Sequence, residues 1–231
     1  MDKTYALLAA AGTGSRLGAE IPKQYLPLAG KPVLSYSLSV FGHHPEIDGL
    51  IVVVGAGWEK KGRRLVEQAR INKPAVVVTG GAERQESVYR GLLAVPEQAQ
   101  LVLIHDAARP LVTEALISRV IKAARRTGAV VPGVPLKDTI KQIDEDCLVA
   151  KSLPRDRLVA VQTPQAFRHR LILKAHAKAA VDQFRATDDA MLVEQLGLPV
   201  ETVLGDECNF KITTGLDLEL ARLLLIGDGN R

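Results

Sequence analysis

The chain has 231 residues, a formal net charge of +4 from 30 basic and 26 acidic side chains, and 47% hydrophobic but only 4% aromatic residues. This length suits one large α/β domain with an aliphatic core. The weak positive charge gives no argument for nucleic acid binding, although it would suit a small polyanionic ligand.

The N-terminal apolar run is short and no apolar run reaches the length of a membrane span, so we expect a cytoplasmic protein without a membrane partner. The two cysteines, Cys147 and Cys208, lie far apart and are expected to be ordinary thiols.

Short aliphatic runs alternate along the chain with segments of helical pattern. Runs that are apolar at nearly every position are typical of strands covered on both faces, and they occur at 5–11, 50–55, 75–79, 101–105, 129–134 and 200–204. Helical patterns lie at 32–41, 59–71, 85–95 and 113–127. The alternation predicts one domain over residues 1–231 with a doubly wound, mostly parallel sheet of the Rossmann-like kind. Ligands of such sheets bind at the carboxyl ends of strands, so the residues just after each run are candidates for a site.

Residues 136–163 interrupt this alternation. They contain three β-like pieces and two polar turns, at 144–146 and 154–156, with no long helix between them. We expect an antiparallel β-arm that projects from the sheet, and its uncovered faces favour pairing with a second subunit. Further along we expect a helix from about 168, another from 187–189, a short strand at 209–213, and a last helix that begins with a capping box at Thr214 and Asp217.

A glycine loop follows the first strand and carries Gly12, Gly14 and Arg16. The dinucleotide-binding fingerprint is disfavoured, because Leu17 stands where it needs glycine or alanine, and no Gly-Lys-Ser/Thr ends a Walker A loop. A plain strand–helix turn would also use glycine. The interpretation that we favour is a loop whose backbone N–H groups and Arg16 surround a triphosphate, with Lys23 as a second cation seven residues later.

The glycine loop and the element Pro22-Lys23-Gln24 resemble the signature of nucleotidyltransferases that activate sugar and polyol phosphates. Further blocks narrow the resemblance: GGAERQESV at 80–88, HDAARP at 105–110, KDTIK at 137–141, QTPQAF at 162–167 and NFKIT at 209–213. Together they resemble the 2-C-methyl-D-erythritol 4-phosphate cytidylyltransferase family over nearly the whole chain. The resemblance implies a homodimeric transferase of the non-mevalonate isoprenoid pathway that uses CTP and 2-C-methyl-D-erythritol 4-phosphate.

Asp106 follows the strand at 101–105, at the carboxyl end where a ligand would bind. A lone aspartate there is often a turn or cap residue, but facing a phosphate loop it can hold Mg²⁺, which takes hard oxygen ligands. We favour the metal role, and the resemblance supports it. Arg109 either ties down this loop or contacts the nucleotide. We expect His105 to be a structural neighbour of Asp106.

The resemblance also implies roles for other residues. It implies a nucleotide site that includes Ala10, Ala11, Gly12, Gly14, Gly81, Ser87, Asp106 and Arg109, in which Gly81 and Ser87 recognise cytosine. It implies that the acceptor is held by Arg155, Lys211, Thr139, Thr163 and Thr187, and that Arg155 and Thr163 reach the site of the other subunit. The remaining histidines considered (His43, His44, His169 and His176) and the stretch from Trp58 through EKKGRR are expected at the surface.

The implied nucleophile is a phosphate monoester whose second pKa is about 6, so it needs no general base at neutral pH. Arg16 and Lys23 would act as the catalytic cations by neutralising charge in the transition state. Two alternatives remain at this stage: a cytidylyltransferase that uses ribitol 5-phosphate, and a catalytically silent nucleotide sensor on the same fold.

Overall fold

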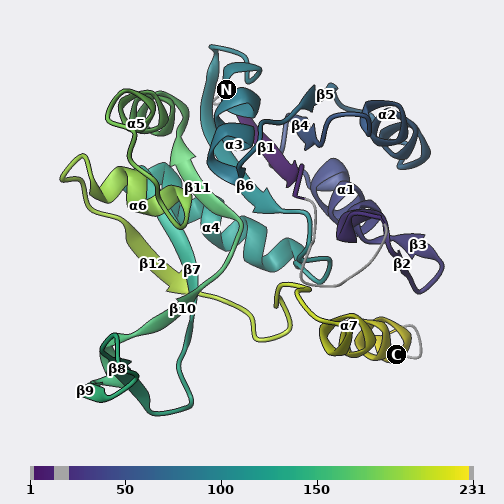
Figure 1. The fold of residues 1–231 in the computed structure, drawn as a ribbon. Coiled ribbons are helices and arrows are strands. Elements are labelled where there is room, and N and C mark those ends of the chain that lie inside the picture. Colours follow the sequence, from purple (N-terminus) through teal and green to yellow (C-terminus); the bar gives the residue numbers. More distant parts are fainter. Residues whose placement is uncertain (1–2, 13–20, 229–231) are drawn as a thin grey trace.

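An eight-stranded mixed sheet runs through the molecule in the order β10-β7-β11-β6-β1-β4-β5, with β12 paired to β7 (Figure 1). The computed structural model describes residues 3–12 and 21–228. The strands of the sheet are β1 (Lys3–Ala10), β4 (Gly49–Val54), β5 (Ala75–Thr79), β6 (Ala99–Asp106), β7 (Ala129–Pro135), β10 (Val159–Val161), β11 (Gln165–Arg168) and β12 (Glu201–Leu204). The pairs β1–β4, β1–β6, β4–β5 and β7–β12 are parallel. The predicted doubly wound, mostly parallel α/β sheet is therefore confirmed.

Helices cover both faces of the sheet, which explains why its central strands are apolar at nearly every position. Every residue of β4 is buried. Adjacent residues of β1 point to opposite faces, so Leu8 joins the core under α1 (Val33–His43), α2 (Glu59–Gln68) and α4 (Glu114–Thr127). Leu7 joins the core under α3 (Arg84–Leu93), α5 (His169–Val181) and α6 (Asp189–Glu194).

A smaller layer includes the C-terminal helix and lies away from the N-terminal end of the chain (Figure 1). It consists of η2 (Lys23–Tyr25), β2 (Pro27–Leu28), β3 (Lys31–Pro32) and the last helix, α7 (Gly215–Asp228), and its own core includes Leu28 and Ala221. The predicted capping box of α7 is present. The N–H of Thr214 donates to Asp217 Oδ2 at 2.7 Å, and the N–H of Asp217 donates to Thr214 Oγ1 at 3.2 Å.

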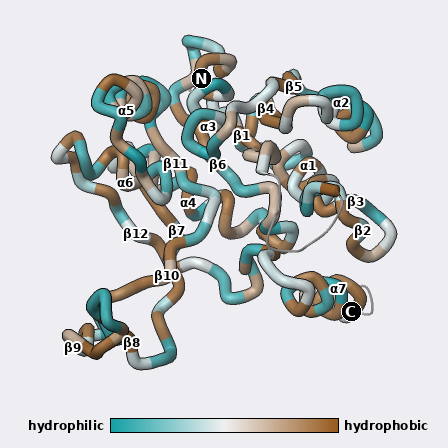
Figure 2. The backbone as a smooth tube through the Cα atoms, viewed as in Figure 1, coloured by the Kyte–Doolittle hydropathy of each residue, from teal (hydrophilic) through white to brown (hydrophobic). Residues whose placement is uncertain are grey.

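The predicted arm is a projecting antiparallel hairpin of β8 (Ile140–Ile143) and β9 (Val149–Leu153), followed by the short helix η3 (Arg155–Arg157). The third predicted β-piece, β10, lies in the main sheet beside β7. Gly133 permits this pairing, because a Cβ there would lie only 2.8 Å from the Cβ of Val159. Figure 2 shows apolar residues on the hairpin, and Ile143, Leu148 and Val149 are all exposed.

One predicted strand is absent from the structure, and one strand of the sheet was not predicted. Residues 209–213 form no strand and run as an irregular segment whose Ile212 N–H donates to Ala108 O at 2.8 Å. In contrast, β11 was not predicted, although it pairs antiparallel with both β6 and β7 at the middle of the sheet. Its four residues include the polar ends Gln165 and Arg168, so pairing with distant strands decides its structure rather than local pattern.

The prediction of surface histidines was wrong at three of the four positions. His44, His169 and His176 are buried, and only His43 is exposed. Each buried ring has a partner: His44 Nε2 lies 3.1 Å from Ser118 Oγ, His169 Nε2 lies 3.3 Å from Leu92 O, and His176 Nε2 lies 3.1 Å from Asp189 Oδ1. Burial without such partners would be unfavourable for an imidazole.

The prediction that Trp58 lies at the surface was also wrong. Trp58 is half-buried and stacks on Tyr25 with ring centroids 4.3 Å apart, whereas Lys60, Lys61 and the arginines that follow are exposed as expected. Both cysteines are free and exposed. Within the described ranges, no helix is long and apolar enough to cross a membrane.

Candidate active site

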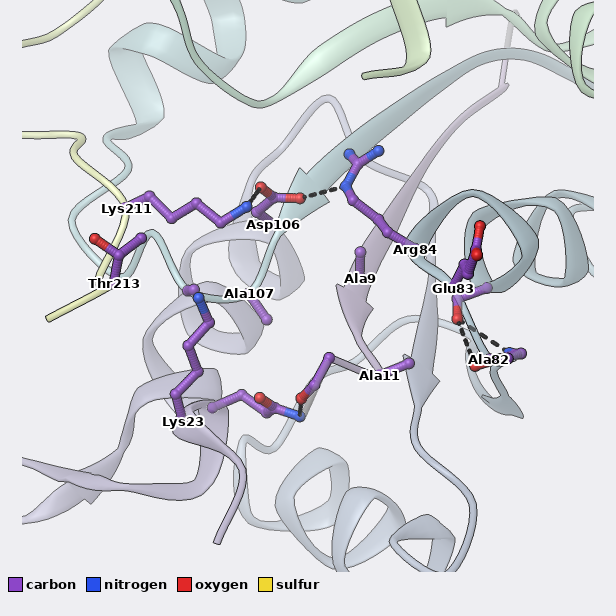
Figure 3. Close-up of a pocket in the computed structure, with 15 residues that line it drawn as sticks. Ala9, Ala11, Lys23, Ala82, Glu83, Arg84, Asp106, Ala107, Lys211 and Thr213 are labelled. Carbon is purple, nitrogen blue, oxygen red and sulfur yellow. Dashed lines mark hydrogen bonds and ion pairs between the residues drawn. The ribbon is translucent and has the colours of Figure 1, made fainter. Parts of the chain in front are cut away.

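A cavity of about 350 Å³ opens at the carboxyl ends of β1 and β6, the place that the topology of the sheet predicts for a ligand (Figure 3). The end of β1, the turn η2, the loop that opens α3, the end of β6 and the segment before α7 all contribute to its wall. The lining residues are Ala9, Ala11, Gly12, Lys23, Gln24, Gly81, Ala82, Glu83, Arg84, Ser87, Asp106, Ala107, Ala108, Lys211 and Thr213.

The described wall carries more positive than negative charge. The cations Lys23, Arg84 and Lys211 line it, together with the carboxylates Glu83 and Asp106. Since a cleft lined by one excess sign of charge attracts ligands of the other sign, this cavity suits a polyanion such as a triphosphate.

Asp106 lies between two of these cations, which approach it from opposite sides in Figure 3. Its Oδ1 accepts from Arg84 Nε at 3.0 Å, and its Oδ2 accepts from Lys211 Nζ at 2.6 Å. Burial alone would raise the pKa of Asp106, but the charges of Arg84 and Lys211 outweigh it and hold the pKa far below its usual range. The carboxylate is therefore ionised at neutral pH and fixes both cations at the cavity wall.

Two buried side chains hold Asp106 from behind. The N–H of Asp106 donates to Thr163 Oγ1 at 3.0 Å, and the same hydroxyl lies 3.1 Å from His105 Nδ1. His105 Nε2 lies 3.1 Å from Arg109 O, which can only accept, so Nε2 carries the proton and Nδ1 accepts from the Thr163 hydroxyl. Burial lowers the pKa of His105 to about 4, which keeps the ring neutral. As predicted, His105 is a structural neighbour of Asp106.

Arg84 connects the cavity to a second buried carboxylate. Its Nη2 donates to Asp189 Oδ2 at 2.7 Å, and Asp189 Oδ1 lies 3.1 Å from His176 Nε2. Burial would raise the pKa of Asp189, but Arg84 and His176 lower it. The sequence analysis missed Arg84 and used Asp189 only as a helix start, although Arg84 follows the strand at 75–79 and the strand-end rule points to that loop.

Lys23 lines a part of the cavity wall away from Asp106, on the single turn η2. Its Nζ donates to Ile212 O at 3.0 Å, which joins this turn to the segment that carries Lys211. The side chain of Gln24 donates to Ala10 O at 2.6 Å and to Gly12 O at 3.0 Å, so η2 is fastened to the end of β1. The predicted partners Gly14 and Arg16 lie outside the described residues.

The loop that follows β5 requires glycine for a steric reason. A Cβ on Gly80 would lie 2.6 Å from the Cβ of Ala11 and 2.7 Å from Ser87 Oγ. The N–H of Gly81 donates to Ser87 Oγ at 3.0 Å. This loop therefore approaches the end of β1 closely and leaves Gly81 and Ser87 on the cavity wall.

The structure brings together seven of the fifteen predicted site residues at the cavity. Ala11, Gly12, Lys23, Gly81, Ser87, Asp106 and Lys211 line the cavity, while Ala10 lies beside it as an acceptor for Gln24. Arg109 donates to Asn209 O at 2.7 Å and so ties the loop after β6 to the C-terminal segment.

The remaining predicted acceptor residues do not line this cavity. Thr163 is buried behind Asp106. Thr139 and Arg155 are exposed on the arm, where Arg155 donates to Lys137 O at 2.6 Å. Thr187 is exposed before α6, with its hydroxyl 3.7 Å from Met191 Sδ.

The fold and the cavity define the class of protein. A doubly wound sheet with a glycine-rich sequence after its first strand and a cationic cavity at its strand ends is the arrangement of a nucleotidyltransferase. A sequence model of the 2-C-methyl-D-erythritol 4-phosphate cytidylyltransferase family matches residues 4–226, and the chain belongs to this family.

Individual relatives agree with this assignment. A protein of Desulforamulus reducens named 2-C-methyl-D-erythritol 4-phosphate cytidylyltransferase is 46% identical over 226 residues, which cover 97% of each chain. The solved structure of 4-diphosphocytidyl-2C-methyl-D-erythritol synthase from Anaerococcus prevotii superposes with a TM-score of 0.87 at 33% identity, covering 97% of this chain and 99% of that one. The Thermus thermophilus cytidylyltransferase structure gives a TM-score of 0.79 at 38% identity and covers 97% of this chain and 98% of that one. The family resemblance read from the sequence is confirmed.

Proposed function

We propose that the cavity at the carboxyl ends of β1 and β6 transfers CMP from CTP to 2-C-methyl-D-erythritol 4-phosphate and releases pyrophosphate. The observation that carries this proposal is Asp106 held between Arg84 and Lys211, opposite Lys23, in a cavity of excess positive charge. Family membership supplies the identity of the two substrates.

The reaction forms one bond and breaks one bond at the α-phosphorus of CTP. An oxygen of the acceptor phosphate attacks this phosphorus, and the bond to the β-phosphate breaks, so that pyrophosphate leaves. The acceptor phosphate is largely a dianion at neutral pH, because its second pKa is about 6. No proton has to be removed, and the main barrier is the approach of one anion to another.

The cations of the wall lower that barrier. We assign Lys23, with Arg16 of the glycine loop, to the charge that develops around the α-phosphate, because a preorganised cation stabilises a transition state without reorganisation. Lys211 is held by Asp106 at 2.6 Å. We assign it to positioning the acceptor phosphate beside the nucleotide.

We also propose Mg²⁺ as the cofactor, with Asp106 as its protein ligand. An ionised carboxylate on the cavity wall fits the one or two carboxylates that Mg²⁺ takes at phosphate sites. Among the described residues there is no group of three or more His, Cys, Asp or Glu side chains that could hold a metal alone. The ion would therefore depend on the nucleotide for most of its ligands. When bound, Mg²⁺ supplies further positive charge to the phosphate oxygens.

We propose that the functional unit is a homodimer formed through the β-arm. Arg155 and Thr139 lie on the arm and outside the cavity of their own chain, and the hairpin exposes Ile143, Leu148 and Val149. A C₂ arrangement would let each arm reach the cavity of the other subunit. The free, exposed cysteines fit a cytoplasmic, reducing location for this dimer.

Subunit exchange tests the shared site. Arg155→Ala and Lys23→Ala, each inactive alone, are mixed and allowed to exchange. In a heterodimer one site keeps both cations and the other lacks both, so random exchange should restore roughly a quarter of wild-type activity by the symmetry of a C₂ pair. If mass analysis confirms exchange and no activity returns, the arm does not complete the partner's site.

Pyrophosphate release tests the reaction itself. CTP is incubated with Mg²⁺ and either 2-C-methyl-D-erythritol 4-phosphate, ribitol 5-phosphate or no acceptor. Release with 2-C-methyl-D-erythritol 4-phosphate supports the proposal. Release only with ribitol 5-phosphate would favour a cytidylyltransferase that uses ribitol 5-phosphate. No release with either acceptor, from a protein that binds CTP, would indicate a nucleotide sensor.

A further inference from the structure

The turn η2 is a single turn of 3₁₀ helix with three side chains that point in three directions, as expected for three residues per turn. Lys23 enters the cavity, and Gln24 fastens the turn to the end of β1. The third side chain, Tyr25, is only 3% exposed and packs away from the cavity against Trp58.

Trp58 and Lys61 enclose Tyr25 on that side. The rings of Tyr25 and Trp58 are 4.3 Å apart and inclined by 14°, and Lys61 Nζ lies 5.1 Å from the centroid of each. These are the distances of a stacked aromatic pair and of a cation–π contact. Tyr25 is therefore held by the ring of Trp58, the N-cap residue of α2, and by the cation of Lys61 in the first turn of that helix.

The base of this stack is fixed beside the cavity. A Cβ on Gly55 would lie 3.3 Å from Ala11 O and 3.8 Å from Trp58 Cδ1, so Gly55 packs closely between Trp58 and Ala11, which lines the cavity. The hydroxyl of Thr79, at the end of β5, donates to Glu59 at 2.9 Å and anchors the start of α2 to the sheet. The N–H of Trp58 also donates to Gly55 O at 3.1 Å, directly after β4, so the stack connects the sheet to η2.

We propose that Trp58, supported by Lys61, is a positioning residue that aims Lys23 into the cavity through Tyr25. The proposal rests on the proposed function, in which Lys23 acts on the phosphates. The turn has few bonds of its own: Tyr25 N–H donates to Pro22 O at 2.9 Å and Leu26 N–H donates to Lys23 O at 3.2 Å. Its orientation therefore depends on the contacts of its side chains, which are the bond of Lys23 to Ile212 O, the bonds of Gln24 to Ala10 O and Gly12 O, and the stack of Tyr25.

Kinetics of Trp58 variants test the proposal. Trp58→Ala should lower kcat at least roughly tenfold, because a misplacement of about 1 Å at a reacting group can cost about 100-fold. Trp58→Phe keeps a ring for the stack and should restore most of the lost kcat. If a folded Trp58→Ala variant keeps wild-type kcat, or if Trp58→Phe falls as far as Trp58→Ala, the proposal is wrong.

A milder pair of variants serves if Trp58→Ala does not fold. Lys61→Gln removes the cation over both rings and should lower kcat roughly two- to fivefold, the factor that corresponds to an exposed cation–π contact. Lys60→Gln removes the adjacent exposed lysine of the same helix and should leave kcat unchanged. Equal kcat values for these two variants would contradict the proposal.

Fluorescence separates this proposal from the proposed function, because Trp58 is the only tryptophan of the chain. CTP with Mg²⁺, without acceptor, should produce a saturable change in emission that is lost in Lys23→Ala. Wild-type protein that releases no pyrophosphate would contradict the proposed function. The proposed coupling between the cavity and Trp58 would then be tested with inorganic tripolyphosphate. Unchanged Trp58 emission with both CTP and tripolyphosphate would contradict this coupling.

Discussion

Replacing Asp106 by asparagine removes one negative charge from the centre of the candidate site and keeps the shape of the side chain. In the wild-type protein, Arg84 Nε and Lys211 Nζ lie 3.0 Å and 2.6 Å from the carboxylate of Asp106. The amide of asparagine retains one acceptor oxygen but turns its NH₂ group toward one of these two cations. Loss of one partner from a buried ion pair costs about 3–5 kcal/mol of stability. The side chains of Arg84 and Lys211 are 31% and 34% exposed, and Arg84 keeps Asp189, so solvent reduces the penalty. We expect a loss of about 2 kcal/mol in the free energy of unfolding.

Urea denaturation at several pH values measures this loss. The pKa of Asp106 is depressed in the folded state, so its stabilisation is complete above the unfolded pKa of about 4 and is lost as the pH falls below it. The difference between wild type and Asp106→Asn should therefore be constant from neutral pH to about pH 5 and shrink in more acidic solution. Glu97→Gln, at an exposed loop position, is the matched control and should unfold like wild type. Equal urea midpoints at pH 7, or a difference that does not shrink in acid, would refute the ion-pair reasoning.

Two further predictions concern the other wall of the cavity and the last helix. Lys23→Ala should lower kcat at least about 100-fold in steady-state assays, the scale for losing one charge-stabilising donor. A normal kcat with a raised KM for CTP would instead make Lys23 a ground-state binder. Asp217→Ala should lower the free energy of unfolding by about 1 kcal/mol, because Asp217 Oδ2 accepts from the N–H groups of Thr213 at 2.8 Å and Thr214 at 2.7 Å. Thermal unfolding checks this against Glu219→Ala on the same helix, and equal effects would show that the cap contributes nothing.

The parts of the fold that depend on local pattern could be predicted from the sequence. The run at 75–79 forms β5 with the predicted bounds, although β5 is an edge strand whose residues are only partly buried. The capping box of α7 was also predictable from local sequence, because its two partners are three residues apart. Elements whose structure depends on distant partners were not predictable in this way. The strand β11 exists through its pairing with β6 and β7, and the segment at 209–213 follows the loop after β6 rather than a neighbouring strand.

The same distinction holds within the site. Lys23, Asp106 and Lys211 were identified from motifs, and all three line the cavity. Arg84 was missed because its importance comes from Asp106 and Asp189, which lie 22 and 105 residues away. Hydropathy alone predicts that His176 is exposed to solvent. The residue is buried instead, because its ring contacts the buried carboxylate of Asp189.

The identity of the acceptor is the central claim, and a competition experiment tests it most directly. CTP, Mg²⁺ and equal amounts of 2-C-methyl-D-erythritol 4-phosphate and ribitol 5-phosphate are incubated with the protein, and the products are followed by phosphorus NMR and mass spectrometry. We expect one pyrophosphate for each CTP consumed, together with a single cytidine diphosphate ester that contains methylerythritol. A product that contains ribitol, or CTP that stays intact, would contradict the account.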